Sequence, residues 1–307
     1  MLDIHQLNLF LAAAETLSFT QAAARLHMTQ PSISQHIKSL ENHFGCELFI
    51  RNGRSLELTD AGLALVPLAQ EAVSLSVRID ETMASLNGDV VGHLIVGCST
   101  TPGKYVLPQL LAHFHEHYPR VRATCQVSSQ HQTLQMLLNG EAHFALASIT
   151  EQFSPDLEFH LFLRDHVVLI APLNHPWAER IEIEPGDLQG THFILREESS
   201  GTYAAVREAL SKFGISIKNL DTLLTLGNSE AIAMAVQEGL GVGFVSEMVV
   251  RRMGEERLAR VKIRGMDIYR EIYFARNPRR PATVAQTAFW NFLSKEKFML
   301  RHEPVPN

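Results

Sequence analysis

Two sets of polar side chains in this sequence have types and spacing that suit recognition chemistry. The first set lies within residues 29–44, where apolar side chains recur at steps of three and four. On a helix these apolar side chains fall within an arc of about 60°; they are Ile33, Ile37, Leu40 and Phe44. Roughly opposite lie Pro31, Gln35, Lys38 and Asn42, flanked by Ser32 and Ser34. Because hydroxyls and amides can contact base edges and phosphates without filling the major groove, this face suits DNA.

The second set lies in three loops, each of which leaves an expected strand and precedes an expected helix. They read Ser99-Thr100-Thr101-Pro102, Glu198-Ser199-Ser200-Gly201-Thr202 and Gly227-Asn228-Ser229-Glu230. Helix N-termini present unpaired N–H groups and a positive dipole end, and such loops are where ligands bind in open α/β sheets. Helix capping alone would explain any single loop. Together the loops favour a small anion, such as a carboxylate, a phosphorylated metabolite or an inorganic oxyanion, over a large aromatic ligand.

Motifs for covalent or metal chemistry are absent from the sequence. It contains no G-x-S-x-G, no H-E-x-x-H and no phosphate-loop pattern, which disfavours an enzyme. His113 and His117 share a helix face, but no carboxylate or cysteine with ligand-like spacing completes a metal site. We therefore expect no metal and no cofactor besides a small-molecule effector.

The three cysteines, Cys46, Cys98 and Cys125, are widely spaced and odd in number, which argues against a disulfide framework. Cys98 ends an expected strand beside Ser99, so redox sensing through its oxidation is one alternative role. Packing in the core is the commoner role of such a cysteine, and no resolving partner is evident in the sequence.

Two further helices are expected before the polar face of residues 29–42. Apolar spacing predicts a helix over residues 4–16. Ser18-Phe19-Thr20-Gln21 is a capping box that begins a second helix, which ends near His27. Thr29 is then the expected N-cap of the third helix, with Pro31 in its first turn. Two short helices, a turn and a third helix with a polar outer face match a helix-turn-helix.

A two-stranded wing is expected directly after this helix-turn-helix. Gly45 is a good residue to end the third helix. Residues 48–58 then read as a hairpin around the Asn52-Gly53 turn. Arg51 and Arg54 flank its tip, where they could grip phosphates or enter the minor groove.

At this point the chain resembles the LysR-type transcriptional regulators. The residues that carry the resemblance are Phe10, Ser18-Phe19-Thr20-Gln21-Ala22-Ala23, Leu26, Thr29-Gln30-Pro31-Ser32-Ile33-Ser34, Ile37, Leu40-Glu41, Leu48-Phe49-Ile50-Arg51 and Leu58-Thr59-Asp60-Ala61-Gly62. The resemblance implies DNA contacts from the third helix and the wing, by Thr29, Gln30, Pro31, Ser32, Ser34, Gln35, Lys38, Arg51 and Arg54. It also implies an effector held between two lobes, as in periplasmic solute-binding proteins. The positions that resemble effector contacts are Ser99, Thr100, Thr101, Ser128, Ser148, Ser199, Ser200, Gly201, Thr202 and Asn228.

A long helix is expected between the DNA-binding and effector-binding parts. Thr59 caps it, and its apolar positions follow alternating steps of three and four, as in a short coiled coil. These positions are Leu65, Leu68, Ala72, Leu75, Ile79 and Leu86, and Thr82 occupies the one position of the pattern that is not apolar. A single helix packed on its own chain would show the same pattern, and the resemblance favours dimerisation. We therefore expect a DNA-binding domain at 1–58, a linker helix at 59–88 and an effector domain at 89–307.

From residue 93 onward strands and helices alternate, which predicts an α/β domain with parallel sheets. The expected strands span residues 93–97, 121–127, 144–148, 167–171, 192–195, 223–226 and 242–246. Helical stretches are expected around residues 107–117, 131–139, 202–213, 229–238 and 283–294. With a crossing near 149–165 and a return near 266–274, lobe I would comprise about 89–162 and 268–307, and lobe II about 163–267.

Composition gives the remaining limits on function. The net charge is −6, and residues 1–58 hold four basic against five acidic residues, so a DNA interface depends on where charges lie. No uninterrupted apolar run approaches the ~20 residues of a membrane span, and no basic leader precedes residues 7–14. We expect a cytoplasmic, non-enzymatic regulator with double-stranded DNA, a small-molecule effector, a second copy of the chain and RNA polymerase as partners. A solute-binding protein without a transcriptional role and an enzyme on the α/β part are the competing interpretations.

Overall fold

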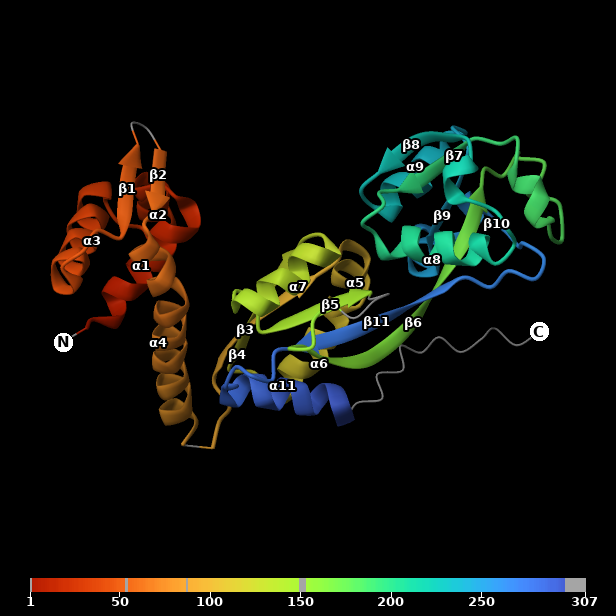
Figure 1. Ribbon diagram of the computed structural model, residues 1–307. Helices are drawn as coiled ribbons and strands as arrows, with labels where there is room; N and C mark the ends of the chain where they lie inside the picture. The colour runs from red at the N-terminus through yellow and green to blue at the C-terminus, as the bar shows by residue number, and fades with distance from the viewer. Residues whose placement is uncertain (1, 53–54, 87, 149–152, 296–307) are drawn as a thin grey trace. The chain divides into compact units, whose positions relative to one another are not determined.

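The computed structural model describes residues 2–52, 55–86, 88–148 and 153–295 (Figure 1). The chain divides into two compact units, Met1–Asp89 and Val90–Asn307. Each unit has hydrophobic clusters of its own, and the two are described separately below.

The first unit is a three-helix bundle followed by a hairpin. Its elements are α1 (Ile4–Thr16), α2 (Phe19–Arg25), α3 (Gln30–Phe44), β1 (Phe49–Asn52) and β2 (Ser55–Leu58). Ser18 caps α2 by accepting a hydrogen bond from the backbone N–H of Gln21 at 3.3 Å, and Gly45 ends α3 in the left-handed region at φ 70°. The antiparallel β1–β2 pair confirms the predicted wing.

Thr29 occupies the predicted N-cap position of α3, although its side chain makes no capping hydrogen bond. One local prediction on α3 was wrong. Ile33, Ile37 and Leu40 are buried as predicted, whereas Phe44 is 41% exposed. Phe44 is the last residue of α3 and is not part of the buried cluster that contains Ile33, Ile37 and Leu40.

The helix α4 (Asp60–Ser85) completes the first unit. Thr59 caps it by accepting a hydrogen bond from the N–H of Gly62 at 2.9 Å. Ala69 is buried in the core of the first unit, and Ala61, Leu65, Val66, Ala72 and Val73 pack against it. Other apolar side chains of α4 and of its C-cap are exposed: Leu63, Leu68, Leu75, Val77, Ile79, Met83 and Leu86. By length and composition α4 could cross a membrane, but it carries Glu71, Arg78 and Asp80 within its length.

The second unit is a curled α/β sheet with the order β4-β3-β5-β11-β6-β9-β7-β8, and β10 pairs with β6. Its strands are β3 (Gly92–Cys98), β4 (Val121–Val127), β5 (Phe144–Ser148), β6 (Glu158–Ala171), β7 (Phe193–Arg196), β8 (Thr222–Leu226), β9 (Val242–Ser246), β10 (Ala259–Val261) and β11 (Tyr269–Arg276). Pairing is parallel for β3–β4, β3–β5, β7–β8 and β7–β9. The parallel pairs therefore form two separate groups, one on each side of β6 and β11.

The helices of this unit are distributed between these two groups of strands. They are α5 (Thr100–Tyr105), α6 (Leu107–His117), α7 (Gln130–Asn139), α8 (Gly201–Ser211), α9 (Ser229–Gln237), α10 (Glu247–Met253) and α11 (Val284–Lys295), with short 3-10 turns at Pro185–Leu188, Ile217–Asn219 and Glu255–Arg257. We call β3–β5 with α5–α7 and α11 lobe I, and β7–β10 with α8–α10 lobe II. Antiparallel β6 and β11 run between them (Figure 1).

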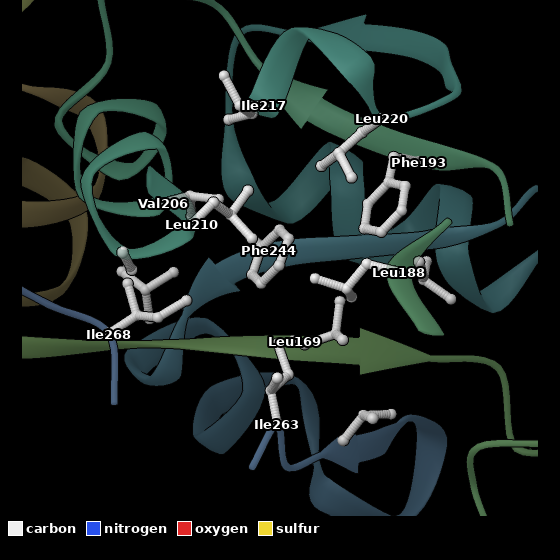
Figure 2. Packing of buried hydrophobic residues seen from close by; sticks show 14 of the residues in the cluster. Leu169, Leu188, Phe193, Val206, Leu210, Ile217, Leu220, Phe244, Ile263 and Ile268 are labelled. Carbon is white, nitrogen blue, oxygen red and sulfur yellow. The ribbon is translucent and has the colours of Figure 1, made fainter. Parts of the chain in front are cut away.

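Each lobe has its own apolar core. Lobe I is filled by residues such as Val96, Phe144 and Phe289, which form one cluster. In lobe II, Phe193 and Phe244 belong to the largest cluster, together with Leu169 of β6, where α8 and the strands meet (Figure 2). Few side chains of one lobe join the cluster of the other, among them Met248 of α10 and Tyr105 of α5.

Part of the predicted crossing between the lobes, residues 149–165, is a strand. Residues 149–152 lie outside the described residues. Residues 158–165 were expected only as a connection, and they form the first part of the long strand β6, which runs between the lobes and pairs with β11 from Glu158 to His166. The strand was missed because its side chains in this part alternate only weakly between apolar and charged. The short elements β10, α5 and α10 were also missed.

Candidate functional sites

The outer face of α3 is a shallow polar surface. Its lining residues are Gln30, Pro31, Ser34, Gln35, Lys38, Ser39 and Asn42. Gln35 is exposed, and the Lys38 side chain is 62% exposed with its Nζ 3.5 Å from Glu41 Oε2. The other carboxylate oxygen of Glu41, Oε1, accepts a hydrogen bond from the N–H of Leu48 at 3.0 Å. Glu41 therefore ties the start of the wing to the helix that bears the polar face.

Five of the predicted DNA contacts, Gln30, Pro31, Ser34, Gln35 and Lys38, lie together on this face. Thr29 precedes its first turn, and Ser32 is half-buried on α3. Arg51 lies on β1, where only its backbone is described, and Arg54 lies outside the described residues.

A second candidate site is a cleft of about 380 Å³ between lobe I and lobe II. Its described lining residues are Ser99, Thr100, Thr101, Val127, Ser128, Ser129, Gln130, Arg196, Glu197, Ser199, Ser200, Gly201, Gly227 and Arg270. Seven predicted positions are among them: Ser99, Thr100, Thr101, Ser128, Ser199, Ser200 and Gly201. No aromatic residue occurs in this lining.

The three remaining predicted positions lie beside the cleft or serve the fold. Ser148 and Thr202 are each 1% exposed and lie next to the lining residues at the ends of β5 and α8. Asn228 caps α9 by accepting a hydrogen bond from the N–H of Ala231 at 2.7 Å. Helix capping alone therefore explains the position of the Asn228 side chain in this loop.

Several buried polar atoms around the cleft have no hydrogen-bond partner. These atoms are the hydroxyl oxygens of Ser99, Thr101, Ser148 and Thr202, Oε1 of Gln130 and Nη2 of Arg270. An unsatisfied buried polar atom costs roughly 1–3 kcal/mol, so such a group of atoms is rarely left without a ligand or water. They come from lobe I, lobe II and the connecting strand β11, and a ligand in the cleft would be in contact with all three.

Gly201 allows the two lobes to come into contact beside the cleft. A Cβ atom placed on Gly201 would lie 2.6 Å from the Cβ and 2.8 Å from the Oγ of Ser148. Contacts this short are excluded by van der Waals repulsion. The first turn of α8 can therefore reach the end of β5 only because residue 201 has no side chain.

A second contact between the lobes joins α5 to α9. Lys104 Nζ lies 3.0 Å from Glu230 Oε1. Burial, together with a hydrogen bond to Glu230, raises the pKa of Tyr105. Lys104 and Tyr105 together lower the pKa of Glu230 against the opposing effect of its burial.

Sequence reasoning missed both arginines of the cleft. Arg196 ends β7, and Arg270 lies on β11 as the cross-strand partner of Asp165. A basic residue within an apolar strand segment was the available signal, since charged residues are buried only when they are paired. The prediction considered loops and small hydroxyl residues, so it did not include charged residues on strands.

Cys98 does not have the surroundings of a redox sensor. It is fully buried, and burial, with a smaller effect of Cys125, raises the pKa of its thiol to about 12. A thiol this weakly acidic is almost entirely protonated at neutral pH and reacts slowly with oxidants. Gly103 packs so closely that a Cβ there would lie 2.4 Å from the Cys98 Sγ. Cys98 is a packing residue, and the redox alternative is not favoured.

No cluster of metal-binding side chains occurs among the described residues. The winged helix-turn-helix and the two-lobed domain with its polar cleft define a DNA-binding regulator with a ligand-binding domain. Two family models match in these regions: the bacterial regulatory helix-turn-helix protein of the lysR family at residues 4–63, and the LysR substrate binding domain at residues 87–297. The chain belongs to the LysR family of transcriptional regulators.

Individual relatives agree with this assignment. The chain is 32% identical over 289 residues to an uncharacterized HTH-type transcriptional regulator of Methanocaldococcus jannaschii, covering 93% of this chain and 96% of the relative. It is similar to full-length CbnR complexed with its target DNA, with a TM-score of 0.67, 22% identity and coverage of 95% and 99% of the two chains. The regulatory domain of Synechocystis CcmR in complex with 2-PG matches with a TM-score of 0.60 and 28% identity, covering 66% of this chain and 95% of that one.

Proposed function

We propose that this cytoplasmic protein binds promoter DNA through the polar face of α3 and changes its DNA binding when a small anion occupies the inter-lobe cleft. It acts as a regulator and not as an enzyme, and it recruits or restrains RNA polymerase from its DNA site. The observation that carries the effector half is the group of unpartnered buried polar atoms around the cleft. CcmR with 2-PG is a relative with a small ligand in its regulatory domain, which supports the same use here.

DNA recognition is assigned to Gln30, Pro31, Ser32, Ser34, Gln35 and Lys38, with Thr29 at the helix start and Arg51 and Arg54 on the wing. An amide such as Gln35 can make two hydrogen bonds to one adenine, and Lys38 can bind a phosphate or guanine. The exposed side chains of this face leave these groups accessible to a groove.

Dimerisation is assigned to the exposed apolar side of α4. Leu68, Leu75, Ile79 and Leu86 recur at steps of seven, four and seven and are each about half exposed or more. Apolar residues at such steps form the seam of a coiled coil, and a second copy of the chain would cover them. Two copies would place two α3 helices on successive half-sites of a dyad operator.

Footprinting on the DNA upstream of the protein's own gene tests the DNA-binding half. Gln35→Ala should abolish or relax recognition of the protected site, because it removes a side chain from the centre of the α3 face. Gln189→Ala, which removes an exposed amide from the second unit, is the matched control and should leave the footprint unchanged. Unaltered footprints with both variants would contradict the assignment of α3.

Gly201→Ala tests the effector half. The added methyl group would collide with Ser148 and hold α8 away from β5, so a ligand that needs both lobes should bind at least tenfold more weakly. Gly227→Ala is the matched control, because Gly227 lines the same cleft and a Cβ there would have no neighbour within 4 Å. Isothermal titration with 2-PG and inorganic phosphate measures both variants. Equal affinities for the two would show that closure at Gly201 has no part in binding.

A further inference from the structure

Arg270 is a buried cation on one of the two strands that join the lobes. Its side chain is 4% exposed, and its Nε donates a hydrogen bond to Asp165 Oδ2 at 2.8 Å. Asp165 lies directly across from it on β6. The Oδ1 atom of Asp165 accepts a hydrogen bond from Ser246 Oγ at 2.7 Å, which fixes the carboxylate from lobe II.

The guanidinium of Arg270 has hydrogen-bonding capacity left. Its Nη2 also lies 2.8 Å from Asp165 Oδ2, but the geometry gives no hydrogen bond, and this nitrogen has no other partner. A guanidinium carries five N–H donors, so one carboxylate oxygen cannot use them all. Arg270 lines the inter-lobe cleft, where these donors can meet a ligand.

The second arginine of the cleft is bound on every nitrogen. Arg196 donates from Nε at 2.8 Å and from Nη2 at 2.7 Å to the two carboxylate oxygens of Glu197, and from Nη1 to Ser229 Oγ at 3.4 Å. This two-pronged pairing is the strongest arrangement for an arginine and a carboxylate. An anion would have to compete with Glu197 for Arg196, whereas Arg270 offers donors without displacing its partner.

The surroundings of Arg270 supply the other donors that an oxyanion needs. Thr101 from lobe I, Ser148 at the end of β5 and Thr202 from lobe II are each 1% exposed with unpartnered hydroxyls. Ser148 and Arg270 also share the lining of a neighbouring cavity of about 290 Å³, which places them near each other. The helix α8, three turns long, begins at Gly201 beside these groups and adds the positive end of its dipole.

We propose that Arg270 is the residue that binds the charge of the effector, and that this effector carries a compact oxyanion, a carboxylate or a phosphate. The inference rests on the proposed effector cleft, and it identifies the side chain that binds the charged group of the ligand. Hydroxyls from both lobes bind the other oxygens of the same group. Because Arg270 lies on a strand that connects the lobes, the anion contacts lobe I, lobe II and this connection at once.

Isothermal titration of the full-length protein with acetate, inorganic phosphate and 2-PG tests the proposal. Arg270→Met should weaken binding of the best probe at least tenfold and reduce the dependence of its Kd on salt concentration, since the charged contact is lost. Arg270→Lys should keep part of the affinity and of the salt dependence. Arg196→Met is the matched control, and it should weaken binding less than Arg270→Met.

Arg270→Met leaves Asp165 buried without its partner, so this variant could fail to fold. The double variant Arg270→Met with Asp165→Leu removes both charges, and replacing a buried ion pair by apolar residues commonly preserves folding. It should show the same loss of binding. Retained affinity in a folded Arg270 variant, or a larger loss from Arg196→Met, overturns the assignment of Arg270 and leaves the effector cleft standing. Failure of every probe to bind the wild-type protein overturns the anionic effector itself, and with it this inference.

Discussion

The polar face of α3 and the inter-lobe cleft both depend on polar side chains, but they are built in opposite ways. The face of α3 comes from one continuous segment, and side chains such as Gln35 and Lys38 are exposed to solvent. The cleft is assembled from residues as distant in sequence as Ser99 and Arg270, and many of its polar atoms are buried. Changes on α3 should therefore alter binding with little effect on folding, whereas changes near the cleft should affect both.

The largest expected effect is on stability, at the buried ion pair beside the cleft. Asp165 has only 2% of its surface exposed, so Asp165→Ala leaves the Arg270 charge buried without its carboxylate partner. Breaking a buried ion pair in this way lowers the free energy of unfolding by about 3–5 kcal/mol. Chemical denaturation followed by hydrogen exchange should show this loss in the second unit. Arg164→Ala, which breaks an exposed ion pair with Glu271 on the same two strands, is the control and should change stability little. Similar losses in both variants would contradict the contrast between buried and exposed polar groups.

A pH effect of comparable size is expected in lobe I. Burial, with a smaller contribution from His93, lowers the pKa of His143 to about 4. The ordinary pKa of histidine is about 6.5, so the unfolded chain binds this proton first as the pH falls. Stability that is fully present above pH ~6.5 should then decline as the pH falls toward 4, by up to about 3 kcal/mol.

Hydrogen exchange of β3 and β5 between pH 7 and pH 4.5 measures this decline, after correction for the intrinsic exchange rate. In the folded protein, Nδ1 of His143 accepts a hydrogen bond from the N–H of Ile95 at 3.1 Å. His143→Asn keeps an acceptor there but cannot take up a proton, so it should flatten the pH dependence of lobe I. An equally steep decline in this variant would assign the effect to other groups.

The same contrast explains which features could be predicted from the sequence. Helix caps and amphipathic periods are local, so the bounds of α1 to α3, the wing and most strands of the second unit followed from neighbouring residues. The polar face of α3 is also local, because one helical period decides which side chains share a face. The partnership of Arg270 with Asp165 depends on strands more than a hundred residues apart. No period or cap in the sequence specifies that pairing.

Exposure also decided where a single residue of the first unit was misjudged. Phe44 fits the apolar period of α3, yet it is exposed at the end of this helix. Its residue type was read correctly, and its environment was set by elements that the local pattern does not describe. Asn228 caps α9, and its role as a ligand contact stays a prediction.

A smaller effect, confined to DNA binding, is expected for Lys38→Ala. Lys38 is largely exposed and its ion pair with Glu41 is long at 3.5 Å, so unfolding should change little. Loss of one phosphate or base contact should weaken operator binding about tenfold. It should also reduce the slope of log K against log salt concentration by about one. Lys212→Ala, which removes an exposed lysine from the second unit, is the control in gel shifts over a range of salt concentrations. A large stability loss in Lys38→Ala would mean that this face is part of the core.

The smallest effect is expected at Cys98, because its burial in the second unit should prevent its thiol from reacting with reagents in solution. Cys46 and Cys125 are exposed, whereas Cys98 is buried with its pKa raised to about 12. A thiol reagent should modify the two exposed cysteines in the native protein and reach Cys98 only after denaturation. Mild peroxide treatment of a Cys46→Ser, Cys125→Ser variant should then leave operator affinity unchanged, because the thiolate that would react is scarcely populated. Rapid modification of Cys98 accompanied by a change in DNA affinity would instead identify this residue as a redox sensor. Burial in the second unit would then not be enough to make a thiol unreactive.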